Sequence, residues 1–293
     1  MKKILYISFL LLTVISTRAQ VSNLKKALVA IKSGDYPTAK VFLDSAASHP
    51  ETQEMLETWY YRGYIYRELY KAQEKNNPNS PLREEAVESY KKFFELDTMS
   101  EFRSSAEKTL NALAVSYYND AVVNLTAENY PVAVKNFEKY KATVRIFDPN
   151  RTFTDVEKQF HKALASLFAQ MYEADRKNNE PYFQKAIDEY SLVLKLDSND
   201  YSANYNLAIL YYNEAVNIIK ETEYEVDLIT LDLIQEKTVD LFKRALPYMQ
   251  KAYRLNPNKK EPLIGLVGIY YSLNEIDKYE ELNQKLEQMK TQE

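Results

Sequence analysis

Small and aromatic residues recur along this chain at a fixed helical spacing. Ala208 and Tyr211 share one face of a predicted helix, and Ala245 begins a second such series. The interval from Ala186 to Ala208 and the interval from Ala245 to Val267 are both 22 residues. A small side chain lets two helices cross closely, and a large neighbour fills the adjacent hole. The spacing therefore predicts helical hairpins, each leaving an apolar face that the next hairpin must cover.

The composition also favours an all-α fold. Four Gly among 293 residues are too few for the many turns of an all-β protein, while a hydrophobic content of 45% is sufficient to form a core. The chain has no Cys, so disulfides and thiolate metal sites are excluded. We therefore expect packing alone to stabilise the fold.

The spacing resembles the 34-residue tetratricopeptide repeat, in which W-x2-L-G-x2-Y is followed by A-x3-F and a Pro. The segment Trp59 to Tyr66 keeps the aromatic residue, the Gly and the Tyr, and has Arg62 where Leu is usual. The resemblance implies an α-solenoid, a right-handed superhelix of about six hairpins with insertions in the second and fifth. The approximate repeats are 20–51, 56–99, 103–148, 152–198, 201–257 and 260–293.

Several intervals depart from the regular repeat length. Ala86 and Ala121 are 35 residues apart, and Ala133 and Ala169 are 36 apart, where the family spacing is 22. Long helices or an extra helix must fill these intervals, and a generic α-solenoid remains an alternative for the third and fourth copies. The fifth copy contains an insertion within Glu214–Lys243, which we predict to form two extended helices that protrude from the stack.

Helix crossings and helix starts can be assigned to particular residues. Asp35, Ser80 and Asn129 each lie just before a Pro, and we predict that they cap second helices. Small residues are expected where helices cross, because a larger side chain would separate the two backbones. These small residues are Gly63, Ala121, Ala169 and Ala208.

The N-terminal residues are typical of a bacterial secretory signal peptide. Lys2 and Lys3 precede an apolar run from Ile4 to Ile15, and cleavage is predicted after Ala19. The run is shorter than the about 20 residues that span a bilayer, although a retained membrane anchor is an alternative. A lipid anchor would need a Cys at the cleavage point, and since the sequence has no Cys, no lipid anchor is expected. We therefore expect an exported, periplasmic protein, which a partner could hold at the outer membrane.

The charge of the chain disfavours nucleic acid and anionic lipid surfaces as partners. The precursor has a net charge of −4, and removing Lys2, Lys3 and Arg18 with the leader lowers it by three to −7. Lys and Arg supply most of the affinity for phosphate backbones and anionic membranes. No nucleic-acid partner is expected.

Catalytic and cofactor motifs are missing from the sequence. His49 and His161, the two His residues, lie 112 positions apart and belong to no metal-binding motif, so we interpret them as surface or packing residues. The sequence contains no glycine-rich phosphate loop. The adjacent Glu84 and Glu85 point about 100° apart on a helix, so we interpret them as part of a solvated face. The sequence predicts no enzyme, no metal site and no cofactor.

The resemblance also implies where a partner would bind, because fixed positions of each first helix line the concave face. The residues at those positions are Tyr60, Tyr64, Arg67, Tyr118, Gln170, Glu173, Tyr205, Ile209, Tyr212, Asn213, Ile264 and Tyr271. Tyr recurs among them, and a Tyr ring offers rigid contact area with a polar tip. With 25 Tyr in the chain, some of these residues are also expected to belong to the core.

Two classes of function fit this pattern. The first is a non-enzymatic periplasmic scaffold that binds a protein or peptide partner, within an envelope assembly or secretion complex. The second is a soluble receptor for glycans or cell-wall fragments that uses a Tyr-lined groove. Arrays of this family bind proteins more often than sugars, which favours the scaffold. The Lys/Asn/Arg clamp that holds a C-terminal carboxylate in some members is absent here, so a chaperone-tail adaptor is not expected.

Overall fold

The computed structural model describes residues 22–75, 77–223 and 225–291, and the predicted signal peptide lies outside these ranges. Within them all regular secondary structure is helical, which confirms the all-α prediction. By its contacts the chain divides into two compact units, Met1–Thr152 and Phe153–Glu293. The sequence predicted one continuous array, and the division falls at the junction of the third and fourth predicted repeats.

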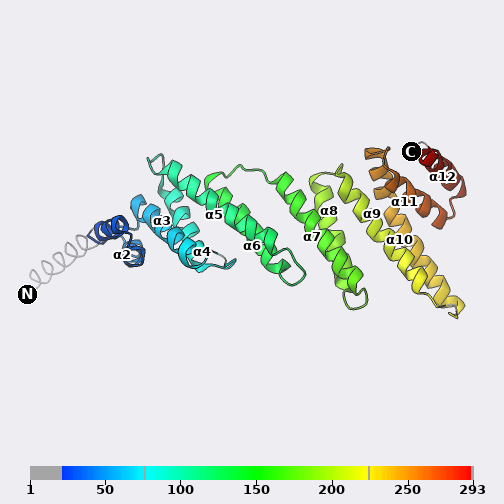
Figure 1. Cartoon of the computed structure of the whole chain (residues 1–293), viewed down its shortest axis with the longest axis horizontal. Helices are drawn as coiled ribbons and strands as arrows, with labels where there is room; N and C mark the ends of the chain where they lie inside the picture. The colour runs from blue at the N-terminus through cyan, green and yellow to red at the C-terminus, as the bar shows by residue number, and fades with distance from the viewer. Residues whose placement is uncertain (1–21, 76, 224, 292–293) are drawn as a thin grey trace, which may run out of the picture. The chain divides into compact units, whose positions relative to one another are not determined.

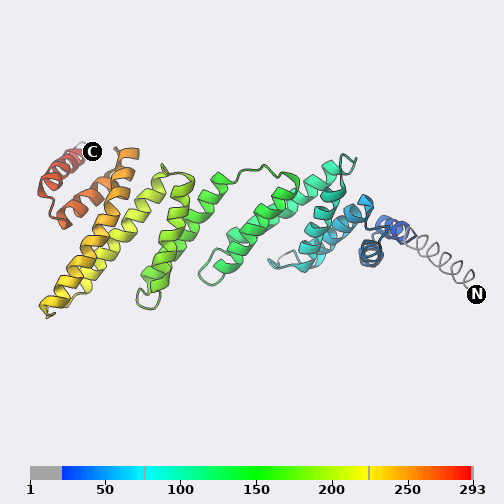
Figure 2. The same ribbon diagram turned by 180° about the vertical axis from the view of Figure 1, so that it is seen from behind.

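The first unit consists of helical hairpins joined by short turns (Figures 1 and 2). A helix over residues 22–33 precedes α2, α3 pairs with α4, and α5 pairs with α6. The helix bounds are α2 Tyr36–Ala47, α3 Leu56–Gln73, α4 Pro81–Leu96, α5 Arg103–Val123 and α6 Tyr130–Phe147. Each pair lies within one of the ranges expected from the repeat spacing.

The second unit contains three further hairpins, in which α7 pairs with α8, α9 with α10 and α11 with α12 (Figure 1). The bounds are α7 Thr154–Ala174, α8 Glu180–Leu196, α9 Tyr201–Glu221, α10 Leu228–Leu255, α11 Lys260–Ser272 and α12 Ile276–Thr291. Helices α5 and α7 are both 21 residues long. Longer helices, rather than an additional helix, therefore fill the long intervals before Ala121 and Ala169.

Three of the four predicted small residues lie at tight helix crossings. Ala121 and Ala208 are fully buried. Gly63 is buried as well, and a Cβ atom placed there would lie 2.8 Å from the ring of Tyr90. The large aromatic residues expected beside such positions, among them Tyr66 and Tyr211, are buried too. The steric interpretation of the repeat pattern is correct at these positions.

Ala169 was assigned wrongly. Its side chain is only half-buried, whereas Ala165, one turn earlier in α7, is fully buried. Phe160, Leu164 and Phe168 are buried with Ala165 and define the packing face of α7. Because α7 begins early and is long, its closest crossing lies one turn before the position that the family spacing indicates.

Two of the three predicted caps form. The Asp35 side chain accepts a hydrogen bond from the backbone N–H of Thr38 at 3.1 Å, and Ser80 accepts one from that of Arg83 at 3.0 Å. Asn129 occupies the N-cap position of α6, but its side chain makes no capping hydrogen bond. Instead, the Oγ1 of Thr126 accepts a hydrogen bond from the backbone N–H of Asn129 at 3.3 Å, so the Thr126 side chain stabilises this turn.

The segment in which the sequence predicted an insertion, Glu214–Lys243, belongs to the long α9–α10 hairpin. Helix α9 has 21 residues and α10 has 28. Helix α11 has only 13 residues, so at 1.5 Å per residue it is about 20 Å long beside an α10 of about 42 Å. Helix α11 is therefore too short to cover the whole α9–α10 hairpin.

Arg62, which replaces the usual Leu, links three helices of the first unit. Its guanidinium donates to Asp44 of α2 at 2.9 Å and to Glu85 of α4 at 2.8 Å, and it lies 4.3 Å from the ring centroid of Tyr66. Burial raises the pKa of Asp44, but hydrogen bonds from Lys40 and Tyr66 and the charge of Arg62 hold it below its usual value. The Arg forms a polar contact between hairpins where Leu would form an apolar one.

Arg83 is fully buried at the start of α4. Its guanidinium donates to the carboxylate of Asp120 at 2.6 Å, to the Pro78 carbonyl at 2.8 Å and to the Ser116 hydroxyl at 3.1 Å. It also lies 3.9 Å from the ring centroid of Tyr117. A buried charge is tolerated only when it is paired and hydrogen-bonded. Arg83 is paired with Asp120 and donates through both terminal nitrogens, whereas its Nε is buried with no hydrogen-bond partner among the described residues. Arg83 therefore ties the α3–α4 hairpin to α5.

We expect Ala208→Leu to lower the free energy of unfolding by about 1–3 kcal/mol, because the added methyl groups have no space between the packed helices. Urea unfolding followed by circular dichroism measures this change. Ala169→Leu is the matched control in the same unit, since Ala169 faces an open groove. If both variants lost the same stability, the assignment of Ala208 to a tight crossing would be wrong.

Candidate partner-binding grooves

A groove between α7 and α9, here called the α7–α9 groove, brings together three of the predicted partner-binding residues, Gln170, Ile209 and Asn213. It has a volume of about 270 Å³. Glu173, which the sequence also indicated, is a fourth predicted residue in its lining. Its lining residues are Ser166, Ala169, Gln170, Glu173, Tyr190, Asn206, Ile209, Leu210 and Asn213. Two first helices supply most of this surface, as the family resemblance implied.

The α7–α9 groove combines an apolar floor with side-chain amides. Ile209 and Leu210 supply apolar surface, while Gln170, Asn206 and Asn213 each carry a carbonyl acceptor and an NH₂ donor. Among the described residues, the amides of Gln170 and Asn213 have no hydrogen-bond partner. An arrangement of this kind can pair with the N–H and C=O groups of a peptide laid across it.

Tyr190 forms the inner wall of the α7–α9 groove and is held in place there. Its hydroxyl lies 3.3 Å from that of Ser166. Burial raises the pKa of Tyr190, and hydrogen bonds to Ser166 and Asn206 lower it only in part. The Tyr190 side chain therefore remains a neutral hydrogen-bonding group in this wall at neutral pH.

The sequence did not predict that Asn206 and Tyr190 would line the groove. Asn206, Ile209 and Asn213 are spaced i, i+3 and i+7, which places them on one face of α9. This spacing could have identified Asn206 once Ile209 and Asn213 had been chosen. Tyr190 belongs to a second helix, and only the packing of α8 behind α7 brings it to the groove.

The predicted Tyr residues of the first unit are engaged in packing. The ring of Tyr60 lies 4.6 Å from that of Phe102, and its hydroxyl is hydrogen-bonded to Ser105. The ring of Tyr118 lies 5.3 Å from that of Tyr140. Both Tyr side chains are half-buried. The structure thus places them in aromatic clusters rather than in the lining of an open groove.

Tyr64 and Arg67 also have partners inside the protein. The ring of Tyr64 meets Tyr36 edge-on at 6.3 Å, and a hydrogen bond with Tyr36, together with burial, raises the pKa of Tyr64 to about 12. Arg67 pairs with the adjacent Glu68 at 2.5 Å. These two side chains are half-buried, so they offer a partner less surface than the sequence suggested.

The predicted Tyr residues of the second unit differ in exposure. Tyr205 stacks on Tyr201 with an angle of 5° between the rings, and Tyr212 packs edge-on against Phe242 at 5.5 Å. Tyr271 is 65% exposed. Ile264, which the sequence placed on the same face, is 53% exposed. Tyr271 is thus the predicted Tyr that offers most of its ring to a partner.

Tyr271 lies in a second depression, here called the apolar groove. This groove lies between the α11–α12 turn and the end of the α9–α10 hairpin at which α9 ends and α10 begins, here called the outer part of the hairpin. The volume is about 700 Å³. Helix α10 supplies six of the thirteen side chains that line it. They are Ile219, Thr222, Glu223, Leu231, Ile234, Gln235, Thr238, Val239, Phe242, Tyr271, Ser272, Asn274 and Ile276.

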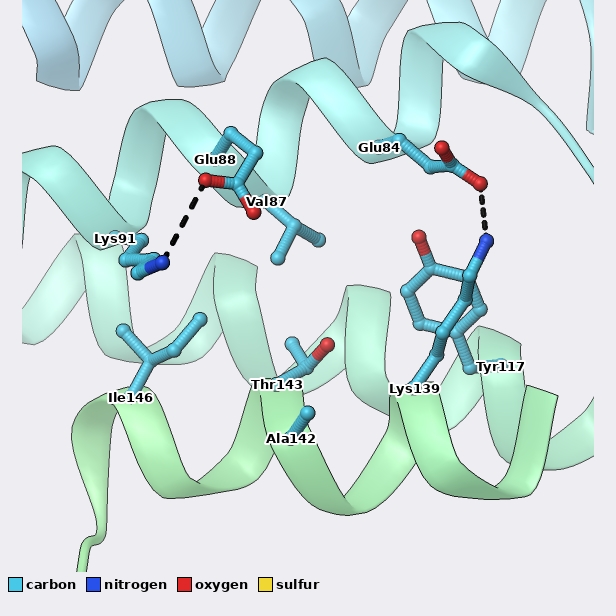
Figure 3. Close-up of a pocket in the computed structure, with 9 residues that line it drawn as sticks. All are labelled: Glu84, Val87, Glu88, Lys91, Tyr117, Lys139, Ala142, Thr143 and Ile146. Atoms are coloured by element: carbon cyan, nitrogen blue, oxygen red, sulfur yellow. Dashed lines mark hydrogen bonds and ion pairs between the residues drawn. The ribbon is translucent and has the colours of Figure 1, made fainter. Parts of the chain in front are cut away.

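A smaller pocket of about 300 Å³ lies between α4 and α6 in the first unit (Figure 3). Figure 3 shows Glu84 of α4 paired with Lys139 of α6, and Glu88 paired with Lys91 at 3.9 Å. Glu85 instead pairs with a different helix, through Arg62. The adjacent Glu84 and Glu85 therefore point apart, as predicted, but they form ion pairs between helices rather than a purely solvated face.

Among the residues that the structure describes, no three His, Asp or Glu side chains gather to hold a metal ion. The Nδ1 of His161 lies 2.6 Å from the carboxylate of Glu189, an ion pair between α7 and α8 whenever the imidazole is protonated. None of the described helices has both the length and the hydropathy to cross a membrane.

Comparison with solved structures finds repeat proteins. YrrB, described as a TPR protein with an unusual peptide-binding site, is 15% identical, with coverage of 83% of this chain and 89% of YrrB and a TM-score of 0.26. The TPR domain of P58(IPK) is 13% identical, with coverage of 94% and 99% and a TM-score of 0.27. The chain is similar to tetratricopeptide-repeat proteins.

Human IFIT1, solved with PPP-AAAA, is 16% identical, with a TM-score of 0.30, over 89% of this chain. The match spans only 58% of IFIT1. No protein-family model and no curated protein matches the chain. These TM-scores are low, so the assignment to tetratricopeptide-like hairpins rests on the residue spacing and on the paired helices themselves.

Proposed function

We propose that this protein is a non-enzymatic scaffold that binds an extended segment of a partner protein in the α7–α9 groove. The observation that carries the proposal is the set of three side-chain amides above an apolar floor on neighbouring helices. An extended peptide presents alternating N–H and C=O groups, and a side-chain amide can satisfy both kinds. Ile209 and Leu210 would contact the side chains of the peptide.

The proposal includes a location. We place the scaffold in the periplasm, held at the outer membrane through its partner, within an envelope assembly or secretion complex. The support is the leader pattern in the sequence, with Lys2 and Lys3 before an apolar run and a predicted cleavage after Ala19. Cell fractionation of a C-terminally tagged protein, with N-terminal sequencing, tests this part separately. An uncleaved protein in the cytoplasm would refute it.

Photo-crosslinking in intact cells tests the binding site. A photoreactive amino acid placed at Asn213 is expected to yield reproducible protein adducts, which mass spectrometry identifies. The same amino acid at Leu196, an exposed position of α8, is the control and is expected to yield none of them. Equal adducts from both positions would show that the α7–α9 groove is not the contact surface.

Once the partner is known, Gln170→Ala combined with Asn213→Ala should weaken its binding by at least about fivefold. Each lost hydrogen bond contributes about 0.5–1.5 kcal/mol, and 1.4 kcal/mol corresponds to tenfold in affinity. Isothermal titration calorimetry measures this loss. Asn111→Ala, at an exposed amide of α5, is the matched control and should leave the affinity unchanged. The free energy of unfolding of the double variant should remain within about 0.5 kcal/mol of that of the parent protein.

Glycan binding is the competing function, and the packing of the Tyr residues bears on it. Sugar rings stack on open aromatic faces, whereas the rings of Tyr60, Tyr118 and Tyr212 lie against other aromatic rings. If crosslinking gives no reproducible protein and muropeptides change the Tyr fluorescence, the glycan function replaces the scaffold. Peptide binding without any response to muropeptides supports the scaffold.

A further inference from the structure

The outer part of the α9–α10 hairpin is covered on one side only. On that side the α7–α8 hairpin contacts it, through an ion pair between Arg176 and Glu221 and a hydrogen bond from Tyr172 to Glu214 at 2.5 Å. On the other side, the short helix α11 ends at Ser272, well before the outer end of α10. The apolar groove occupies the space beyond this end.

Apolar side chains are exposed on this outer part to a degree that packing does not explain. Leu228 is 83% exposed and Ile229 is 76% exposed. Leu231, Leu233 and Ile219 are each exposed over 45% or more of their surface. Single exposed apolar residues are ordinary, but several beside an apolar groove mark an interaction surface.

The α10 side chains of the apolar groove form a continuous stripe. Leu231, Ile234, Thr238 and Phe242 line the groove and follow one another at spacings of three and four residues. This spacing places them on one face of α10 over about three turns. The groove is therefore elongated along α10, and it matches in shape the apolar stripe of a second helix.

Negative charge surrounds the apolar groove. Residues 221–240 contain seven acidic residues and one basic residue, Lys237. Within the described ranges, Glu223, Glu225, Asp232 and Glu236 lie within 4.0 Å of no Lys or Arg nitrogen. Of these, Glu223 lines the groove itself. Unpaired carboxylates around an apolar surface favour a partner that carries positive charge.

From this geometry we propose that the apolar groove binds an amphipathic helix of a partner protein, with an apolar stripe flanked by Lys or Arg. The stripe would lie on Leu231, Ile234 and Phe242, and its flanking cations would face the acidic residues of the hairpin. This surface is separate from the α7–α9 groove, so the inference does not depend on the peptide site proposed above. The partner helix would restore the cover that α11 is too short to provide.

A second copy of the chain is a poorer occupant on electrostatic grounds. In a symmetric dimer the same patch of both subunits meets itself. The acidic segment 221–240 would then face an identical acidic segment, and such like-charge contacts are unfavourable. A cationic helix meets no such repulsion, so a cationic helix is the occupant that fits the apolar groove best.

A designed peptide of about 14 residues, which spans about 21 Å as a helix, tests the proposal. Its Leu residues recur at i, i+3, i+4 and i+7, and Lys occupies the flanking positions. Fluorescence anisotropy with the full chain should show saturable binding that weakens as salt is added. A peptide with Glu in place of Lys, and a scrambled peptide of the same composition, should each bind at least about tenfold more weakly.

Variants of the protein locate the binding. Two variants should each bind the Lys peptide about tenfold more weakly or worse. The first combines Leu231→Ala with Tyr271→Ala, and the second combines Glu223→Lys, Asp232→Lys and Glu236→Lys. Val123→Ala, at an exposed position of α5, is the control and should change nothing. Equal binding of the three peptides, or of the variants and the parent, would overturn the proposal. Self-association of the chain that Leu231→Ala abolishes would also overturn it.

Discussion

Arg83→Met should lower the free energy of unfolding of the protein by about 3–5 kcal/mol. Arg83 is fully buried and donates to Asp120, Pro78 and Ser116. Met fills a similar volume but cannot donate, so these acceptors lose their partner and Asp120 becomes an uncompensated charge near the core. Urea unfolding followed by the fluorescence of Trp59, the single Trp of the chain, reports this loss in the first unit.

Lys92→Met on the same helix is the control for Arg83→Met. Lys92 pairs with Glu95 at 2.6 Å, but both side chains are about half exposed, so solvent screens this pair and it contributes little to stability. If Arg83→Met lowered the free energy of unfolding no more than the control does, the stabilising role of the buried pair would be contradicted. Adding Asp120→Leu to Arg83→Met should recover part of the stability, because it removes the uncompensated charge.

Phe242→Ala should lower the free energy of unfolding by about 3–5 kcal/mol, the usual cost of removing a buried aromatic ring. Phe242 is only 2% exposed, and its ring packs against Tyr212 between α10 and α9. It also forms the base of the apolar groove. Its removal would leave a cavity between these helices. Urea unfolding followed by circular dichroism measures the loss.

Leu233→Ala is the matched control for Phe242→Ala, because Leu233 lies on the same helix and is 61% exposed. We expect it to change stability by less than about 0.5 kcal/mol. A loss below about 1 kcal/mol for Phe242→Ala would show that the surrounding helices close the gap. In that case the base of the apolar groove would be more adaptable than its packing indicates.

The fold was largely predictable from the sequence because its main determinant is periodic. Ala121 and Ala208 are buried where a small side chain was expected, and the long α9–α10 hairpin forms where an insertion was expected. Ala169 shows the limit of this reasoning. Spacing counts residues from one repeat to the next, but in the longer α7 the fully buried small residue is Ala165, one turn earlier.

The candidate site was predictable only in part. Gln170 of α7 meets Ile209 and Asn213 of α9 in the α7–α9 groove. Helix periodicity places Ile209 and Asn213 on one face of α9, and the family resemblance selected the corresponding position of α7. Tyr60 and Tyr212 were chosen by the same rule, yet they pack against Phe102 and Phe242. A Tyr serves equally well in a core and at an interface, so its position in a repeat cannot distinguish these roles.

The sequence by itself determined that the chain is helical, where its hairpins turn and that Gly63, Ala121 and Ala208 are buried small residues. These properties depend on residues close together in the chain, where propensity and spacing act directly. Only the tertiary structure decided that Arg83 is buried against Asp120 and that α11 leaves the end of the α9–α10 hairpin open. Both depend on how far neighbouring helices extend past one another, because burial arises from surfaces that are distant in sequence.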